Sequence, residues 1–273
     1  MPITLSEFNG IEKKVITLMG MSGVGKTYLS MIMEQNGWKH HSCDLEIGTK
    51  YLGADIEKTL GVENTIVADD LSLLSEYVGR LGAQDKGGLP FDEFKRRQDE
   101  YFDAECSALR ELKKVVAQAH EDGFQNVIHD STGSLCEVDD ETLIESIDEN
   151  SLIVYIKASE EEEREVLKRA QEYPKPLFYS PEKFEEWVAG YMAESGLENS
   201  QAIDPDEFSR WAFPKLFENR LPKYQRIADQ YGVTIPSSAF YGVKNADDFL
   251  EVIQQHLPET LPETSGDSVS VAL

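Results

Sequence analysis

The feature that most constrains this sequence is a glycine-rich loop that follows an apolar run. Residues 15–19 are apolar or β-branched over the length of a strand, residues 20–27 read G-M-S-G-V-G-K-T, and residues 28–35 have a helical pattern. A strand, a G-x-x-x-x-G-K-T loop and a helix in this order define a P-loop, in which backbone N–H groups turn toward phosphate oxygens. The sequence therefore predicts a nucleotide site formed by Gly20, Ser22, Gly23, Val24, Gly25, Lys26, Thr27 and Tyr28.

Two side chains of this loop have specific expected roles. Lys26 is expected to reach the β- and γ-phosphates of ATP, and the Thr27 hydroxyl is expected to bind Mg²⁺. ATP and Mg²⁺ are therefore the predicted cofactors. The alternative is a chance glycine-rich turn, but the strand before the loop and the helix after it argue against a chance match.

Charge limits the classes of partner. The chain of 273 residues has 51 acidic and 26 basic residues, a formal net charge of −25. Such a surface repels phosphate backbones and anionic lipid, so we expect no nucleic acid and no membrane as partners. The sequence has no apolar run of spanning length and no secretory leader, and its three cysteines are far apart. These features predict a cytoplasmic protein with reduced thiols.

The pattern of elements predicts the fold class. Further strands are expected at residues 38–42, 124–129, 152–157 and 233–235, with helical segments between them. Together with residues 15–19, they predict an α/β fold, a doubly wound five-stranded parallel sheet flanked by helices. We expect one domain over residues 1–257, with insertions at about 53–90 and 177–212, and a disordered acidic and polar tail over 258–273.

Capping signals place the helices. Asp92 is expected to cap one long helix that runs to His120, and Asn245 to cap a last helix over residues 246–256. Other helix starts are expected at Ser159, at Ser180-Pro181 and at Asp204-Pro205, with shorter helical pieces at 71–78 and around 215–231.

Three further stretches join the P-loop in a resemblance to a known family. They are Asp44-Leu45-Glu46-Ile47 after the second strand, Arg97 and Glu100 in R-x-x-E spacing, and Lys175-Pro176-Leu177 followed by Arg220-Leu221-Pro222-Lys223-Tyr224. Together they resemble the shikimate kinase branch of the P-loop small-molecule kinases, over most of the chain. The resemblance implies the strand order 2-3-1-4-5 and transfer of the ATP γ-phosphate to a hydroxyl group of a small, anionic metabolite.

The resemblance also implies roles for individual residues. Asp44 would contact the accepting hydroxyl and take its proton, Arg97 and Arg220 would bind a substrate carboxylate, and Gly133 would touch substrate. Lys168, Arg169 and Lys175 are the candidates to close over the phosphates as a lid. The alternatives are a loop aspartate for Asp44, surface ion pairs for the two arginines, and partners of a helix dipole for the basic residues of the lid.

The sequence departs from the family pattern at three places. Ser42 stands where the family has a magnesium-binding aspartate, Ser131-Thr132-Gly133 replaces a glycine triplet, and Lys175 replaces a lid arginine. Asp130, at the end of the third strand, is the expected replacement in the metal site. Its alternative role is to cap the turn that follows. These departures predict a relative with a different substrate.

Two other functions remain open. The first is a P-loop ATPase or regulatory switch that acts on a protein partner, although the sequence has no obvious arginine-finger motif. The second is a toxin-like sugar-nucleotide kinase. A P-loop scaffold hosts many reactions, so the fold alone does not choose among them.

Overall fold

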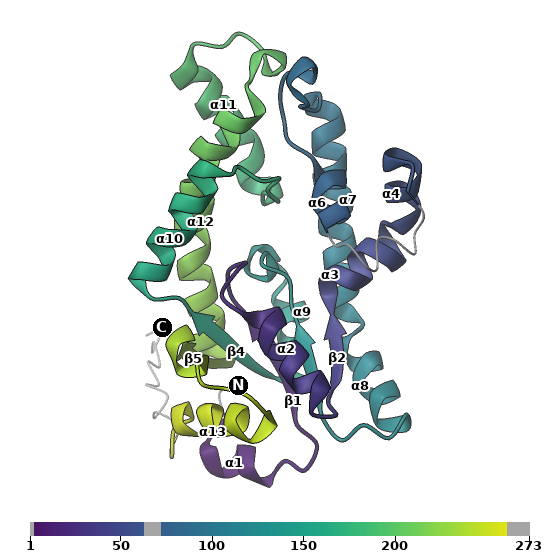
Figure 1. The fold of residues 1–273 in the computed structure, drawn as a ribbon, viewed down its shortest axis with the longest axis vertical. Coiled ribbons are helices and arrows are strands. Elements are labelled where there is room, and N and C mark those ends of the chain that lie inside the picture. The colour runs from purple at the N-terminus through teal and green to yellow at the C-terminus, as the bar shows by residue number, and fades with distance from the viewer. Residues whose placement is uncertain (1–2, 63–71, 261–273) are drawn as a thin grey trace, which may run out of the picture.

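A five-stranded parallel sheet forms the base of the molecule in the computed structural model, which describes residues 3–62 and 72–260 (Figure 1). The strand order is β2-β3-β1-β4-β5 and all the neighbouring strands are parallel, so the predicted fold class is confirmed. The strands are β1 (Val15–Met19), β2 (Lys39–Ser42), β3 (Val127–Asp130), β4 (Leu152–Lys157) and β5 (Gly232–Pro236).

The sheet is covered by helices on both faces because successive buried side chains of its central strands point to opposite faces. Ile16 and Leu18 of β1 pack with residues of α1 (Leu5–Gly10), α2 (Lys26–Gln35) and α13 (Ala246–His256). Met19 of β1 and Tyr155 of β4 pack on the other face, with residues of α3 (Cys43–Glu46), α7 (Phe91–Arg110), α8 (Leu112–Glu121), α9 (Glu141–Asn150) and α12 (Pro205–Tyr231). This two-sided burial is typical of a parallel sheet.

The predicted bounds of β3 and of the helix before it are wrong. The expected helix from Asp92 to His120 is two helices, α7 and α8, which meet at Glu111, and α7 is preceded by Pro90 as its N-cap residue. The strand begins at Val127 because the Phe124 N–H still donates to the Ala119 carbonyl and closes the end of α8. It extends to Asp130, which pairs in register with Leu18 of β1.

Helix α12 is one continuous helix where the sequence predicts two. Pro214 lies inside it and cannot donate to the Arg210 carbonyl. That carbonyl instead accepts a hydrogen bond from Gln171 Nε2 at 2.8 Å, and Arg210 Nε donates to the Gln171 carbonyl at 2.9 Å. Gln171 belongs to α10 (Glu160–Glu172), so a contact between two helices satisfies the group that the proline leaves free.

The remaining capping predictions hold. Ser159 forms the capping box with Glu162, Pro181 opens α11 (Pro181–Ser195), and Asp204 and Asn245 cap α12 and α13. The expected helix at 71–78 is α6 (Ser72–Val78), and α4 (Gly53–Leu60) precedes it. Leu71 and most of the predicted tail, residues 261–273, lie outside the described residues.

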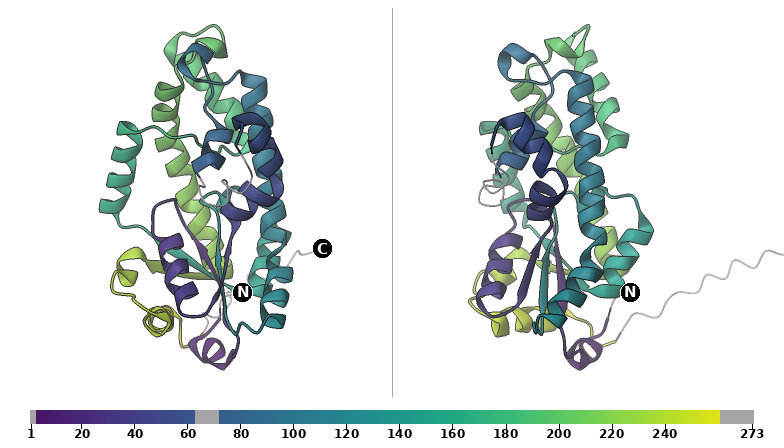
Figure 2. Two further views of the ribbon diagram at one scale, coloured as in Figure 1. Left: turned by 45° about the vertical axis from the view of Figure 1, so that its right-hand side comes forward. Right: turned by 90° about the vertical axis from the view of Figure 1, so that its right-hand side faces the viewer.

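The two predicted insertions meet above the sheet and share an apolar cluster (Figure 2). Leu81 from the first insertion packs with Tyr179, Trp187 and Ile203 from the second. The Ala83 N–H donates to the Ile203 carbonyl at 2.8 Å, and Arg80 forms an ion pair with Asp206. The insertions therefore form one roof over the carboxyl end of the sheet.

No helix in the described ranges is both long enough and apolar enough to cross a membrane.

Gly232 gives a test of the tight contact between β4 and β5. A Cβ atom at this position would lie 2.1 Å from the Ile153 carbonyl oxygen, so the two strands would have to separate. We expect Gly232→Ala to lower the free energy of unfolding by about 1–3 kcal/mol, as overpacking typically does. Gly10→Ala is the matched control because no atom lies within 4 Å of its Cβ position. Equal urea midpoints for the two variants would contradict this account.

Candidate active site

The P-loop joins β1 to α2 at the carboxyl edge of the sheet. Gly23 and Gly25 have φ angles of 91° and 100°, which favour glycine, and the side chains of Ser22 and Thr27 are exposed. Gly25 is the N-cap residue of α2 and no side chain caps this helix end. The N-terminal N–H groups and the dipole of α2 are therefore directed at an open loop, an arrangement that fits an anion such as a phosphate.

Lys26 is buried beneath this loop. Its ammonium group donates to the Gly20 carbonyl at 2.7 Å and to the Met21 carbonyl at 3.2 Å, and only 7% of the residue is exposed. Burial lowers the pKa of Lys26, while the nearby carboxylates of Asp130 and Asp44 act in the opposite direction. The lysine is thus held at the P-loop between backbone carbonyls and two acidic side chains.

Asp44 lies in α3, immediately after β2. Ser42 at the strand end accepts a hydrogen bond from the Leu45 N–H at 3.3 Å and so fixes the start of this short helix. Burial raises the pKa of Asp44 to about 6, Lys26 opposes this shift, and Asp130 adds to it. A carboxylate with this pKa is ionised at neutral pH and can still accept a proton.

Asp130 lies directly beside Ser42 in the sheet, because these two residues pair in register at the ends of β3 and β2. It is 5% exposed, and its Oδ2 atom lies 3.9 Å from His40 Nε2. The short 3₁₀ turn that follows, Leu135–Glu137, has Ser134 at its N-cap position. The neighbouring strand therefore supplies a carboxylate close to the place where Ser42 replaces the family's aspartate.

A cavity of about 650 Å³ opens above these groups. Its walls come from the P-loop, from α3, from the loop after β3, from α10 and the segment after it, and from α12. The lining residues include Met21, Ser22, Gly23, Asp44, Tyr101, Gly133, Ser134, Arg169, Lys175, Phe178 and Arg220. The tertiary structure thus brings residues of the P-loop, Asp44, the lid candidates Arg169 and Lys175, and Arg220 together around one cavity.

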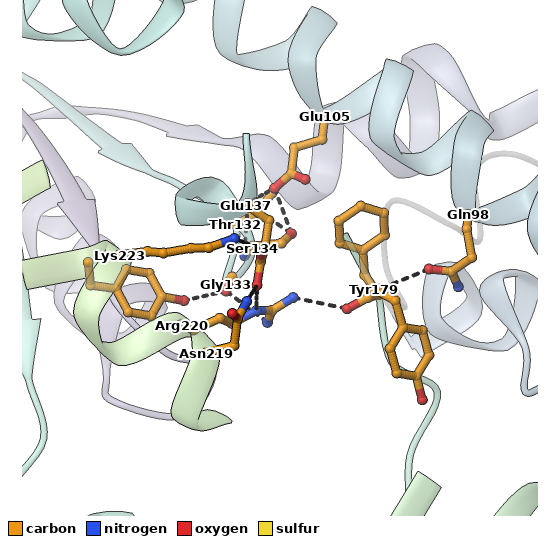
Figure 3. A network of polar contacts seen from close by, with 12 residues as sticks. Gln98, Glu105, Thr132, Gly133, Ser134, Glu137, Tyr179, Asn219, Arg220 and Lys223 are labelled. Atoms are coloured by element: carbon orange, nitrogen blue, oxygen red, sulfur yellow. Dashed lines mark hydrogen bonds and ion pairs between the residues drawn. The ribbon is translucent and has the colours of Figure 1, made fainter. Parts of the chain in front are cut away.

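Arg220 enters this cavity from α12 and is fixed by three contacts (Figure 3). Its guanidinium group donates to Glu137 Oε1 at 3.2 Å, to the Gly133 carbonyl at 3.1 Å and to the Phe178 carbonyl at 3.0 Å. Glu137 is buried and also pairs with Lys223. Each terminal nitrogen of Arg220 carries a second hydrogen that these contacts do not use, so the group can still bind an anion.

Arg97 lies elsewhere. Its Nε atom donates to Glu93 Oε1 at 2.7 Å, Nη1 donates to the Tyr77 carbonyl at 2.5 Å, and the guanidinium carbon lies 5.0 Å from the centroid of the Tyr77 ring. Arg97 is 8% exposed and is not among the residues that line the cavity. The lining of the cavity therefore includes Arg220 but not Arg97. Arg97 pairs with Glu93, as the alternative interpretation expects, but it is buried and not on the surface.

Arg169 and Lys175 occupy the exposed rim of the cavity. A Cβ atom built on Gly23 would lie 3.9 Å from Arg169 Nη2, so the guanidinium group stands over the P-loop. Tyr173, which is 71% exposed, also lines this rim, whereas Lys168 does not. The rim thus places two cations where a triphosphate would leave the loop.

Sequence reasoning missed two buried carboxylates next to the cavity, Glu105 and Glu137. Glu105 is 0% exposed on α7 and accepts hydrogen bonds from the Thr132 and Ser134 hydroxyls. A signal was present, because Glu105 is four residues from both Tyr101 and Leu109, and a helix places residues at this spacing on one face. Glu137 has no such signal, since its partners lie more than eighty residues away in α12.

Comparisons with known proteins place shikimate kinases among the solved structures that are similar to this chain, as the motifs predict. The Bacteroides thetaiotaomicron enzyme is 14% identical, with 89% of this chain and 95% of that chain covered and a TM-score of 0.41. The Aquifex aeolicus enzyme is 12% identical, with 88% of this chain and 92% of that chain covered and a TM-score of 0.36. The Acinetobacter baumannii enzyme, solved with shikimate, is 13% identical, with 80% of this chain and 99% of that chain covered and a TM-score of 0.31. No protein-family model and no curated protein matches. Likeness at this level gives no argument for a shared substrate.

The different surroundings of Arg97 and Arg220 predict different effects of the same substitution. Arg220→Lys keeps the charge but loses the planar fork in the cavity, so we expect it to raise the KM of an anionic substrate about tenfold or more, the loss of one good charge-assisted hydrogen bond. Arg97→Lys should change that KM less than twofold, because Arg97 lies outside the cavity lining. Steady-state kinetics with ATP held saturating measure both. An equal rise in KM for the two variants would show that both arginines reach the substrate.

Proposed function

We propose that this protein is an ATP- and Mg²⁺-dependent phosphotransferase that moves the γ-phosphate to a hydroxyl group of a small, anionic metabolite. The observation that carries this proposal is the shared cavity, in which Asp44, Arg220 and the P-loop face one another. A P-loop binds the donor, Asp44 supplies a base for the acceptor, and Arg220 supplies a cation for an anionic group of the acceptor.

The shape of the site favours a metabolite over a protein partner. A volume of about 650 Å³ lies within the range of small-molecule sites. Residues of both insertions, such as Val78 and Phe178, line the cavity beside the rim of Arg169, Tyr173 and Lys175. These residues would shield one side of a bound acceptor from water. Such shielding suits transfer to a hydroxyl group, because water would otherwise compete as the acceptor.

The transfer requires one proton to leave the acceptor. Asp44 takes the hydroxyl proton as the acceptor oxygen forms its bond to the γ-phosphorus, and the bond from that phosphorus to the bridging oxygen of ADP breaks. Lys26, Arg169 and Lys175 stabilise the negative charge on the migrating phosphoryl group. Thr27 and Asp130 would hold Mg²⁺, which neutralises phosphate charge when it is bound.

A metabolite screen tests this proposal. The purified protein with Mg²⁺ and ATP is incubated with a deproteinised metabolite extract, and mass spectrometry identifies any compound that gains one phosphate. Lys26→Ala should reduce the gain by about 10²-fold or more, the usual cost of removing such a charge. A compound phosphorylated equally by both proteins would point to a contaminant, and ATP hydrolysis without any phosphorylated compound would favour the ATPase alternative.

The pH dependence of transfer tests the role of Asp44. With its pKa near 6, Asp44 is ionised at pH 7, and protonation removes the base as the pH falls. We therefore expect kcat/KM to fall about tenfold per pH unit below about pH 6 in the wild type. Asp44→Asn should lower transfer much more than ATP affinity and should abolish this acid limb. An unchanged acid limb in the variant would assign the titration to another group.

A further inference from the structure

Glu105 is a fully buried carboxyl group to which the proposed reaction gives no role. It lies on α7, and its Oε1 atom accepts hydrogen bonds from Ser134 Oγ at 2.7 Å and from the Thr132 hydroxyl. Its Oε2 atom is also buried and has no hydrogen-bond partner among the described residues. A buried carboxyl group is costly unless its contacts compensate, so its two hydroxyl contacts call for an explanation.

Both contacts of Glu105 go to the loop of residues 131–134, which follows β3 and forms one wall of the cavity (Figure 3). On its far side this loop is held by α12, because the Gly133 carbonyl accepts from Arg220 Nη1 and from the Tyr224 hydroxyl. At its tip a Cβ atom on Gly133 would lie 3.2 Å from Ser22 N in the P-loop. The loop is therefore hydrogen-bonded to α7 on one side and to α12 on the other, and it packs against the P-loop.

The hydroxyls of Thr132 and Ser134 both donate to the same oxygen of Glu105. Two buried hydroxyls and a buried carboxyl group are each unfavourable alone and satisfy one another together. The polar loop and the carboxyl group thus form one unit.

We propose that Glu105 is a positioning residue, which holds the loop of residues 131–134 against the P-loop and so sets the place of Gly133 and Ser134 in the cavity wall. The inference rests on the proposed function only where it treats this wall as part of an acceptor site. The contacts themselves require no bound substrate. Within the described part of the chain Glu105 forms no hydrogen bond with Lys26 or Asp44, so it acts through the loop.

The protonation state of Glu105 provides a readout of this role. Burial raises the pKa of Glu105 to about 7, while the Thr132 and Ser134 hydroxyls and Arg220 oppose the shift and Asp44 adds to it. Tyr101, Cys43 and Cys106 also interact with Glu105, and the pKa of each is raised, which keeps these groups neutral near pH 7. Above pH 7 the ionised carboxylate makes stronger hydrogen bonds to the two hydroxyls, so the loop should be better ordered there.

Hydrogen exchange of the full-length protein without ligands tests the proposal. The reporters are the backbone amides of residues 131–134, since the Ser134 N–H donates to Thr132 Oγ1 at 3.3 Å. Protection relative to the intrinsic rate at each pH should fall by about threefold to tenfold from pH 8 to pH 6 in the wild type, the effect of weakening a charge-assisted hydrogen bond. Glu105→Gln should give a flat profile through pH 7. A profile with the same step as the wild type would overturn the inference.

Two further variants keep the test decisive. Thr132→Val removes a hydroxyl that lowers the pKa of Glu105, so the step in protection should move to higher pH, and an unmoved step would contradict the inference even if Glu105→Gln does not fold. Asp103→Asn makes the same chemical change on the exposed face of α7 and should leave the step unchanged. A step that persists in a protein without transferase activity would reject the proposed function but not the anchoring role of Glu105.

Discussion

The site depends on charges that are buried at the carboxyl edge of the sheet and must compensate one another there. Lys26 lies close to Asp44 and Asp130, and Arg220 and Lys223 share the buried carboxylate of Glu137. Burying any one of these charged groups alone is costly, so each charged side chain lies next to groups that compensate its charge. Arg220 keeps N–H hydrogens that its protein contacts do not use. Asp44 keeps a raised pKa of about 6, so its carboxylate can still accept a proton near neutral pH.

The electrostatics of the cavity contrast with those of the whole chain. The formal net charge is −25, yet the cavity is lined by Arg169, Lys175 and Arg220, with Lys26 beneath the P-loop. Cations that converge in one cavity create a local positive potential, which attracts small anions even when the protein as a whole is acidic. The arrangement therefore gathers basic side chains around one cavity of a chain that is strongly acidic as a whole.

The roof of the cavity shows how the two insertions work together. The first insertion and the second share an apolar cluster that includes Leu81, Tyr179 and Trp187, and Gln98 of α7 bridges to the Leu177 carbonyl and the Tyr179 N–H. The two segments bury apolar side chains against each other, so this part of the core contains residues from both. The residues that line the upper cavity, such as Phe178, are thereby placed by contacts that are distant in sequence.

Local sequence patterns determined the P-loop, the five strands, most of the helix caps and the place of Asp44 at a strand end, because each depends on residues that are neighbours in the chain. The order of the strands and the approach of Asp130 to Ser42 follow from parallel pairing once the sheet is known. Only the tertiary structure separated Arg97 from Arg220 and revealed the buried contacts of Glu105 and Glu137. Periodicity can place a charged residue on a buried helix face, but the partner that compensates its charge comes from another part of the chain, and no local pattern identifies it.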